Sequence, residues 1–272
     1  MQLSIITINL NNSEGLRKTI ESVVSQTFTD FEYIIIDGGS TDGSVDTIKQ
    51  YSDKIAYWIS EPDKGIYNAM NKGIVQAKGK YCLFLNSGDW LAEKNILSSV
   101  FKLNLFQDII YGNLIISKHG KDKQYLTYPQ EKNISLFFFY SRTFPHQSTF
   151  IRKTLFDKRL FAEEYKIVSD VDFFINAIIY DKVSIKYINM VVSYMEDGGV
   201  GTVINELHLN ERKILKEKYF KYLTTDFDHF LFLNSSPLMN EFVRLRKTTG
   251  FEKFIAKLVA FLINIYSIFR KI

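Results

Sequence analysis

Ile34-Ile-Ile-Asp-Gly-Gly-Ser-Thr-Asp-Gly43 joins a short apolar run to a turn rich in glycine and acidic residues. The run is typical of a buried β-strand, because strands that are covered on both faces read as continuous apolar segments. Similar runs, each followed by polar residues, occur at Ser4–Asn9, Ala56–Ile59 and Tyr81–Leu85. The sequence therefore predicts a set of strands whose ends carry polar side chains.

Segments with helical spacing of their apolar residues separate these strands. They are Glu14–Gln26, Ser44–Tyr51, Ile66–Ala77 and Glu93–Leu103. Regular alternation of strand and helix predicts βαβ units and a parallel sheet. After Asp108 the alternation weakens. There we expect a helix at Val171–Ile179, helices from Ile204 onward, and strands at Ile109–Tyr111, Leu114–Ser117, Tyr125–Tyr128, Thr149–Ile151, Val183–Ile188 and Val191–Tyr194.

The composition limits the class of protein. Of the 272 residues, 46 % are apolar and 24 % are charged, which is typical of a globular chain. The single cysteine, Cys82, excludes a disulfide framework and a cysteine-based zinc site. Seven Lys/Arg and two acids fall between Glu241 and Ile272, so the net charge of +4 belongs to the tail and the body is near neutral. This distribution argues against a nucleic-acid-binding protein. We also expect no secretory signal and no spanning helix.

Polar residues after each predicted strand are the first candidates for a site, because ligands of open parallel sheets bind beyond the carboxyl ends of the strands. Each one is also a residue that turns and helix caps favour, so a purely structural role stays open. Asp37 differs, because the next helix begins too far away for Asp37 to cap it. The glycine motifs of dehydrogenases and of P-loop proteins are absent after the first strand, which leaves a carboxylate-held divalent cation as the means of binding a diphosphate.

Five collinear segments resemble the family-2 glycosyltransferases, which have the GT-A fold. They are Ser4-Ile-Ile-Thr-Ile-Asn9, Ser25-Gln-Thr-Phe28, Ile34–Gly43, Glu61-Pro-Asp-Lys-Gly-Ile-Tyr-Asn-Ala-Met-Asn71 and Phe84-Leu-Asn-Ser-Gly-Asp89. The resemblance covers roughly residues 1–200 and is strongest up to Trp90. It implies an α/β fold with a Rossmann-like, mostly parallel central sheet and flanking helices. We expect a catalytic domain over residues 1–203, with a nucleotide-sugar half (1–112) and an acceptor half (113–203), and a helical extension over residues 204–272.

The resemblance also implies a site for a nucleotide-sugar donor. By match, Thr7, Asn9 and Asp37 would hold the nucleoside, Asp63 and Lys64 would lie by the base and phosphates, and Ser87 would contact the donor. The metal motif of the family usually carries several carboxylates, whereas this chain has Asn86-Ser-Gly-Asp89. Asp89 alone is then the expected carboxylate ligand of a divalent metal, Mg²⁺ or Mn²⁺, with phosphate oxygens and waters completing the shell.

A general base is required if the transfer inverts the anomeric centre. The family places the base at the start of a helix in the region of Ser169-Asp-Val-Asp-Phe-Phe174, and Asp170 is the better match. Asp172 is the alternative, and both acids would also suit a helix N-terminus for purely electrostatic reasons. His146 is a candidate contact of the acceptor or the leaving phosphate, or a packing residue. The loop Asp197–Gly201 is a candidate lid or an ordinary glycine turn.

The expected function is therefore transfer of a sugar from a nucleotide-diphospho-sugar, with UDP as the expected nucleotide, to a saccharide or lipid-linked saccharide. The alternatives are a nucleotidyltransferase on a related fold and a sugar-nucleotide-binding protein without transferase activity. The basic, apolar tail at residues 251–272 predicts an amphipathic helix, either at a membrane interface or packed on protein. We expect a cytoplasmic protein with peripheral contact at the inner face of the plasma membrane.

Overall fold

A computed structural model describes residues 1–118, 122–197, 205–235 and 250. It divides into two compact units, Met1–Lys218 and Tyr219–Ile272. The predicted boundary lies earlier, after residue 203, whereas the first unit includes α8 (Glu206–Phe220) up to Lys218. In the second unit the structure describes α9 (Thr224–Ser235). The predicted amphipathic helix at residues 251–272 lies outside the described residues.

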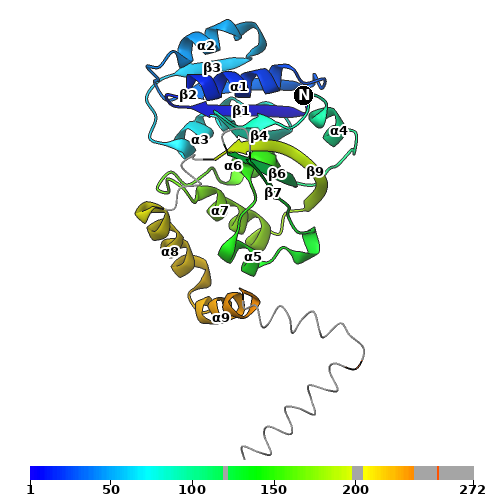
Figure 1. Cartoon of the computed structure of the whole chain (residues 1–272), viewed down its shortest axis with the longest axis vertical. Helices are drawn as coiled ribbons and strands as arrows, with labels where there is room; N and C mark the ends of the chain where they lie inside the picture. Colours follow the sequence, from blue (N-terminus) through cyan, green and yellow to red (C-terminus); the bar gives the residue numbers. More distant parts are fainter. Residues whose placement is uncertain (119–121, 198–204, 236–249, 251–272) are drawn as a thin grey trace, which may run out of the picture. The chain divides into compact units, whose positions relative to one another are not determined.

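The described strands of the first unit form one nine-stranded sheet in the order β3-β2-β1-β4-β8-β6-β9-β5, with β7 paired to β6 (Figure 1). The first four of these strands are parallel to one another, and β6 and β9 run in the same direction, whereas β5, β7 and β8 run antiparallel. The sheet is thus mixed but mostly parallel, which confirms the expected fold class. The strands are β1 (Leu3–Asn9), β2 (Phe31–Asp37), β3 (Tyr57–Ser60), β4 (Tyr81–Asn86), β5 (Trp90–Leu91), β6 (Ile109–Lys118), β7 (Asp122–Leu126), β8 (Thr149–Arg152) and β9 (Ile185–Glu196).

Helices cover both faces of the parallel half of the sheet. The buried residues of α1, α2 and α4 pack with Leu3, Ile5 and their neighbours on one face of the strands. On the opposite face, α3 lies so close to β1 that a Cβ on Gly73 would be 2.4 Å from Cγ2 of Ile6. The helices of the first unit before α8 are α1 (Ser13–Val24), α2 (Ser44–Gln50), α3 (Ile66–Gln76), α4 (Ile96–Phe101), α5 (Leu136–Ser141), α6 (Thr154–Lys158) and α7 (Ser169–Phe174), and η4 (Ile175–Tyr180) continues α7 as a π-helical turn.

The second half of the sheet differs from the prediction in detail. The two expected strands at residues 109–117 are one strand, β6, and those at residues 183–194 are one strand, β9. The register of these two partners shifts between Tyr111 and Leu114, so a bulge interrupts the apolar pattern that the prediction relied on. Gly112 lies at this bulge, and a Cβ there would be 2.7 Å from Cγ2 of Val192.

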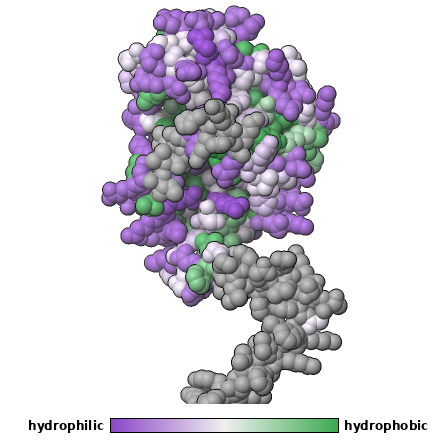
Figure 2. Space-filling model, in the orientation of Figure 1, coloured by the Kyte–Doolittle hydropathy of each residue, from purple (hydrophilic) through white to green (hydrophobic). Residues whose placement is uncertain are grey.

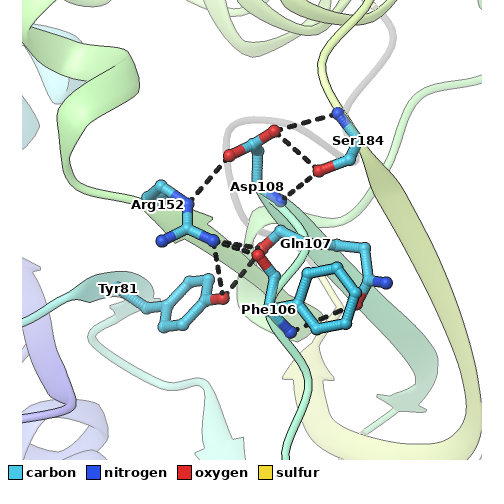
Figure 3. Close-up of polar contacts among 6 residues, drawn as sticks. All are labelled: Tyr81, Phe106, Gln107, Asp108, Arg152 and Ser184. Carbon is cyan, nitrogen blue, oxygen red and sulfur yellow. Dashed lines mark hydrogen bonds and ion pairs between the residues drawn. The ribbon is translucent and has the colours of Figure 1, made fainter.

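A polar cluster joins three segments of this second half (Figure 3). It lies at the end opposite the carboxyl ends of the parallel strands, because Arg152 pairs with Tyr81, the first residue of β4. Asp108, just before β6, accepts hydrogen bonds from Nε of Arg152 (2.8 Å) and from the backbone and hydroxyl of Ser184 (3.0 and 2.7 Å). The Arg152 guanidinium also donates to the backbone carbonyl of Phe106. Burial raises the pKa of Asp108, but the hydrogen bonds from Ser184 and Arg152 lower it by more. The cluster fixes the start of β6 against β8 and β9.

The surface agrees with the composition. Figure 2 shows mostly hydrophilic residues over the described part of this face, with hydrophobic residues in small separate patches. The apolar residues are instead concentrated in the interior, where Tyr33, Tyr81, Tyr111 and Phe84 are among the largest fully buried side chains. Among the described residues, no helix has both the length and the apolar character needed to cross a membrane.

Candidate functional site

A large cavity lies beyond the carboxyl ends of the parallel strands in the first unit. Its volume is about 1060 Å³. Its lining includes the turn after β4, the start of α7, the segment before β8, and one face of α8. The lining residues discussed below are Asn86, Ser87, Asp89, His146, Lys166, Asp170, Tyr67 and Arg212. Of the residues predicted from the sequence, the structure thus brings Ser87, Asp89, His146 and Asp170 together in one place.

The other predicted donor residues lie outside this lining. Asn9, Asp37 and Ser60 are neighbours across the ends of β1, β2 and β3. The Asp37 carboxylate is fully buried and accepts hydrogen bonds from Nδ2 of Asn9 (2.7 Å), from the hydroxyl and backbone of Ser40 (2.6 and 2.9 Å), from the hydroxyl of Ser60 (2.6 Å), and from the backbone of Gly39 (3.2 Å). Burial raises the pKa of Asp37, but these hydrogen bonds together lower it. In this structure Asp37 organises its own turn.

Thr7, Asp63 and Lys64 occupy three different environments. The Thr7 hydroxyl is fully buried in β1 and shares a hydrogen bond of 3.0 Å with the Tyr33 hydroxyl. Asp63 accepts from the backbone of Gly65 (2.7 Å), and its other oxygen would be 2.6 Å from a Cβ on Gly38. Lys64 is exposed, and its carbonyl accepts from Nζ of Lys166 (2.7 Å). Asp63 therefore borders the turn after β2, and Thr7 belongs to the core. Their roles in donor binding stay predictions.

The chain turns sharply at Asn86–Asp89, directly after β4. Gly88 has φ of +103°, a conformation that side chains other than glycine adopt with strain. The turn is held to α1, because Asn12 donates to the carbonyl of Ser87 (3.0 Å) and the hydroxyl of Thr19 donates to the carbonyl of Asp89 (2.6 Å). A glycine in place of a carboxylate at this position is thus what the backbone requires.

Asp89 is buried, and this burial raises its pKa to about 7. The charge of His146 and hydrogen bonds from Gln147 and the backbone oppose the shift without cancelling it. The side-chain oxygen of the neighbouring Asn86 is also buried and has no hydrogen-bond partner. Among the described residues, no group of three His, Cys, Asp or Glu side chains could hold a metal ion. The turn therefore offers one carboxylate and one amide oxygen, which are ligand types that Mg²⁺ and Mn²⁺ accept.

Asp170 is the second buried acid of the cavity. Its Oδ1 lies 3.1 Å from the Tyr67 hydroxyl and 2.8 Å from the backbone nitrogen of Val171. Its Oδ2 lies 3.7 Å from Nδ1 of His146. The other ring nitrogen of His146, Nε2, lies 3.3 Å from Nδ2 of Asn86. His146 therefore lies between the Asn86–Asp89 turn and Asp170. Asp172, the alternative base, instead bonds Nζ of Lys218 (2.7 Å) and is absent from the cavity lining.

Residues that the sequence patterns did not single out complete the surroundings of Asp170. Tyr67 comes from α3, and Arg212 comes from α8. Burial lowers the pKa of Arg212, and electrostatic interaction, with Asp170 first and Tyr67 second, opposes this shift. In the sequence, Tyr67 lies in the family-resembling segment Glu61–Asn71 and in the predicted helix Ile66–Ala77, but neither pattern gave it a role, and no local signal marks Arg212. Tyr67 hydrogen-bonds to Asp170 and Arg212 lines the same cavity, although both are distant from Asp170 in sequence.

Comparison with known proteins identifies the family. Residues 4–161, more than half of the chain, match the model of "Glycosyl transferase family 2". The chain belongs to glycosyl transferase family 2. The match ends at residue 161, so the cavity-lining residues of α7 and α8, which include Asp170 and Arg212, lie outside it. A "PGL/p-HBAD biosynthesis glycosyltransferase" of Mycobacterium bovis is 30 % identical over 209 residues, which cover 74 % of this chain and 79 % of that protein.

Solved structures of glycosyltransferases share the fold. S. aureus TarS 1–349 in complex with UDP-GlcNAc superposes with a TM-score of 0.60 at 20 % identity, over 75 % of this chain and 62 % of that one. The chain spans only 37 % of the longer TarS structure. The mannosyltransferase PcManGT of Pyrobaculum calidifontis, in complex with GDP-Man and Mn²⁺, has a TM-score of 0.54 at 14 % identity, over 74 % of this chain and 58 % of that one. The family-2 chain therefore has the GT-A-like fold of these enzymes.

Proposed function

We propose that this protein transfers a sugar from a nucleotide-diphospho-sugar, expected to be a UDP-sugar, to a hydroxyl of a saccharide or lipid-linked saccharide, with inversion at the anomeric carbon. One observation carries the proposal: Asp89 and Asp170 line the same cavity from two different parts of the family-2 fold. A site for sugar transfer needs one group near the diphosphate and another near the acceptor. The structural relatives in complex with UDP-GlcNAc and GDP-Man support a nucleotide-sugar donor.

In this proposal Asp170 is the general base. It takes the proton of the acceptor hydroxyl as the hydroxyl oxygen attacks the anomeric carbon and the bond from that carbon to the diphosphate breaks. Oδ1 of Asp170 accepts hydrogen bonds from the Tyr67 hydroxyl and from the backbone nitrogen of Val171. Oδ2 of Asp170 accepts no hydrogen bond from the described residues and lies 3.7 Å from Nδ1 of His146. Oδ2 is therefore the atom that is available to the acceptor. The position of His146 supports a contact with the acceptor or the leaving phosphate.

The residues of the Asn86–Asp89 turn fit a divalent metal. Asp89 would supply the carboxylate ligand and Asn86 its unpartnered amide oxygen, with the remaining ligands coming from the donor and from water. A bound Mg²⁺ or Mn²⁺ would neutralise the diphosphate and so stabilise the leaving group. Thr7, Asn9, Asp37, Asp63, Lys64 and Ser87 would shape the nucleotide end of the site, with Asp37 acting through the turn that it holds.

The proposal extends to the location of the protein. The acceptor would be presented at the cytoplasmic face of the plasma membrane, and the basic tail would bind there. This part rests on the sequence of residues 251–272, in which basic residues flank apolar ones.

The experiment that tests this function is a donor assay. Purified protein is incubated with UDP-, GDP- and dTDP-sugars in Mg²⁺, in Mn²⁺ and in EDTA, with simple saccharides as acceptors. We expect metal-dependent nucleotide release from one donor, and an anomeric configuration in the product opposite to that of the donor by NMR. If calorimetry detects no binding of any donor and no nucleotide is released, the proposal is wrong.

A further inference from the structure

A carboxylate from α8 holds the backbone just before Asp170. Glu211 is only 4 % exposed. Its Oε1 accepts from the backbone nitrogen of Lys166 (2.7 Å), and its Oε2 accepts from those of Ile167 (2.9 Å) and Val168 (3.3 Å). One side chain therefore satisfies three consecutive backbone donors. Consecutive N–H groups that converge in this way form a concave site that favours an anion, so this geometry binds the carboxylate tightly.

Other residues of α8 support the same contact. Leu215 is 2 % exposed, and Lys218 donates to Oδ1 of Asp172 (2.7 Å). Residues 211, 215 and 218 are spaced to lie on one face of a helix. This face of α8 thus packs against the segment that carries both acids of α7.

The same segment is held from its other side by α3. The hydroxyl of Tyr67 lies 2.7 Å from the carbonyl oxygen of Ile167 and 3.1 Å from Oδ1 of Asp170. Ile167 is thus bound through its nitrogen by Glu211 and through its carbonyl by Tyr67. Asp170 follows three residues later, at the beginning of α7. The position of the Asp170 carboxylate therefore depends on both contacts.

We propose that Glu211 is a positioning residue for Asp170, so that α8 is part of the active site and not an appendage to it. The inference rests on the proposed function, in which Asp170 is the base. Glu211 touches no substrate and exchanges no proton. It fixes residues 166–168 and thereby sets where the Asp170 carboxylate meets the acceptor hydroxyl.

A purely structural role for Glu211 makes a different prediction. In that case its loss lowers the melting temperature and the yield of folded protein, while each folded molecule turns over at the normal rate. A positioning role lowers kcat in the folded protein and leaves donor binding unchanged, because the proposed function places the donor diphosphate at the Asn86–Asp89 turn and not at residues 166–170. A misplacement of about 1 Å can lower a rate about 100-fold.

The experiment compares Glu211→Ala and Glu211→Gln with Glu217→Gln, which changes an exposed glutamate of the same helix. Melting temperature, donor affinity by calorimetry and kcat of transfer are measured for each. We expect kcat to fall about 100-fold for Glu211→Ala and about 10-fold for Glu211→Gln, which keeps one acceptor oxygen, with donor Kd within about twofold of the wild type. Glu217→Gln should match the wild type in all three.

Asp170→Asn is measured in the same experiment. It tests the assignment of Asp170 as the base separately from the positioning role of Glu211. If Asp170→Asn is inactive and folded Glu211→Ala keeps the normal kcat, the positioning role is wrong and the base assignment stands. If Glu211→Ala does not fold, a normal kcat in Glu211→Gln overturns the inference equally. If Asp170→Asn keeps its turnover, the base assignment fails and the positioning role fails with it.

Discussion

The hydroxyl of Tyr67 in α3 lies 3.1 Å from Oδ1 of Asp170 in α7, although 103 residues separate the two in sequence. This contact joins the parallel half of the fold to the helix that carries the proposed base. Burial raises the pKa of Tyr67 well above its ordinary value, and the nearby Asp170 charge raises it further. The hydroxyl is therefore protonated throughout the neutral range and acts as a donor.

Removing this hydroxyl should slow the reaction. Tyr67→Phe leaves the ring in the core but removes the single O–H proton that Asp170 and the carbonyl of Ile167 share. A hydrogen bond to a charged group contributes about 1.5–3 kcal/mol, so we expect kcat to fall roughly 10-fold or more, with donor Kd unchanged. Steady-state kinetics and calorimetry measure both. Tyr125→Phe, at a residue that is 65 % exposed, is the control, and an unaltered kcat in Tyr67→Phe would refute the role.

Metal binding should depend on the protonation of Asp89. Because burial raises its pKa to about 7, protons compete with the metal below that pH. We expect the apparent affinity for Mn²⁺ to weaken by up to about tenfold for each pH unit below the pKa, and to level off above it. Electron paramagnetic resonance titrations between pH 5.5 and 8 test this.

The matched variants for that titration are Asp89→Asn and Glu14→Gln. Asp89→Asn should lose Mn²⁺ binding and the metal dependence of turnover. Glu14→Gln also changes an acid of the cavity lining, and it should behave as the wild type. Strong Mn²⁺ binding by Asp89→Asn would exclude this turn as the metal site.

Asp37 should make stability sensitive to acid. Its pKa is lowered in the folded protein, so the folded state holds the proton less tightly than the unfolded chain does. The resulting stabilisation is complete above the ordinary pKa of about 3.9 and is lost as the pH falls through the folded value. Asp37→Asn should therefore unfold at lower denaturant concentration at pH 7, and the difference from wild type should shrink on acidification below about pH 4.

Denaturant unfolding followed by circular dichroism at several pH values measures this effect. Asp53→Asn is the control, because Asp53 is exposed in its ion pair with Lys54. A pH-independent difference between Asp37→Asn and wild type would mean that the charge of Asp37 does not stabilise its turn.

The parallel half of the fold could be predicted from sequence because its signals are local. Strands such as β2 are continuous apolar runs, and helices such as α1 bury one regular face. The second half could not be predicted as fully. The two-residue strand β5 is too short to leave a periodic pattern, and the bulge at Gly112 made one strand resemble two.

The candidate site likewise contains residues that the sequence predicted and residues that it could not predict. Asp89 and Asp170 follow local motifs, and both line the cavity. Sequence spacing placed Asp37 at the correct strand end. It could not show that the carboxylate oxygens of Asp37 accept hydrogen bonds from Asn9, Ser40 and Ser60. Glu211 acts on backbone 43 to 45 residues away, a relationship that no local pattern records.

The most direct test of the account is the turnover of Asp170→Asn beside that of Asp172→Asn. Both substitutions remove a buried acid from the same short helix, but only Asp170 lines the cavity, and Asp172 pairs with Lys218. We predict that Asp170→Asn binds donor normally and loses at least about 100-fold in kcat, as expected for a general base, whereas Asp172→Asn keeps most of its turnover. Normal turnover in Asp170→Asn, or loss of turnover only in Asp172→Asn, would contradict the account.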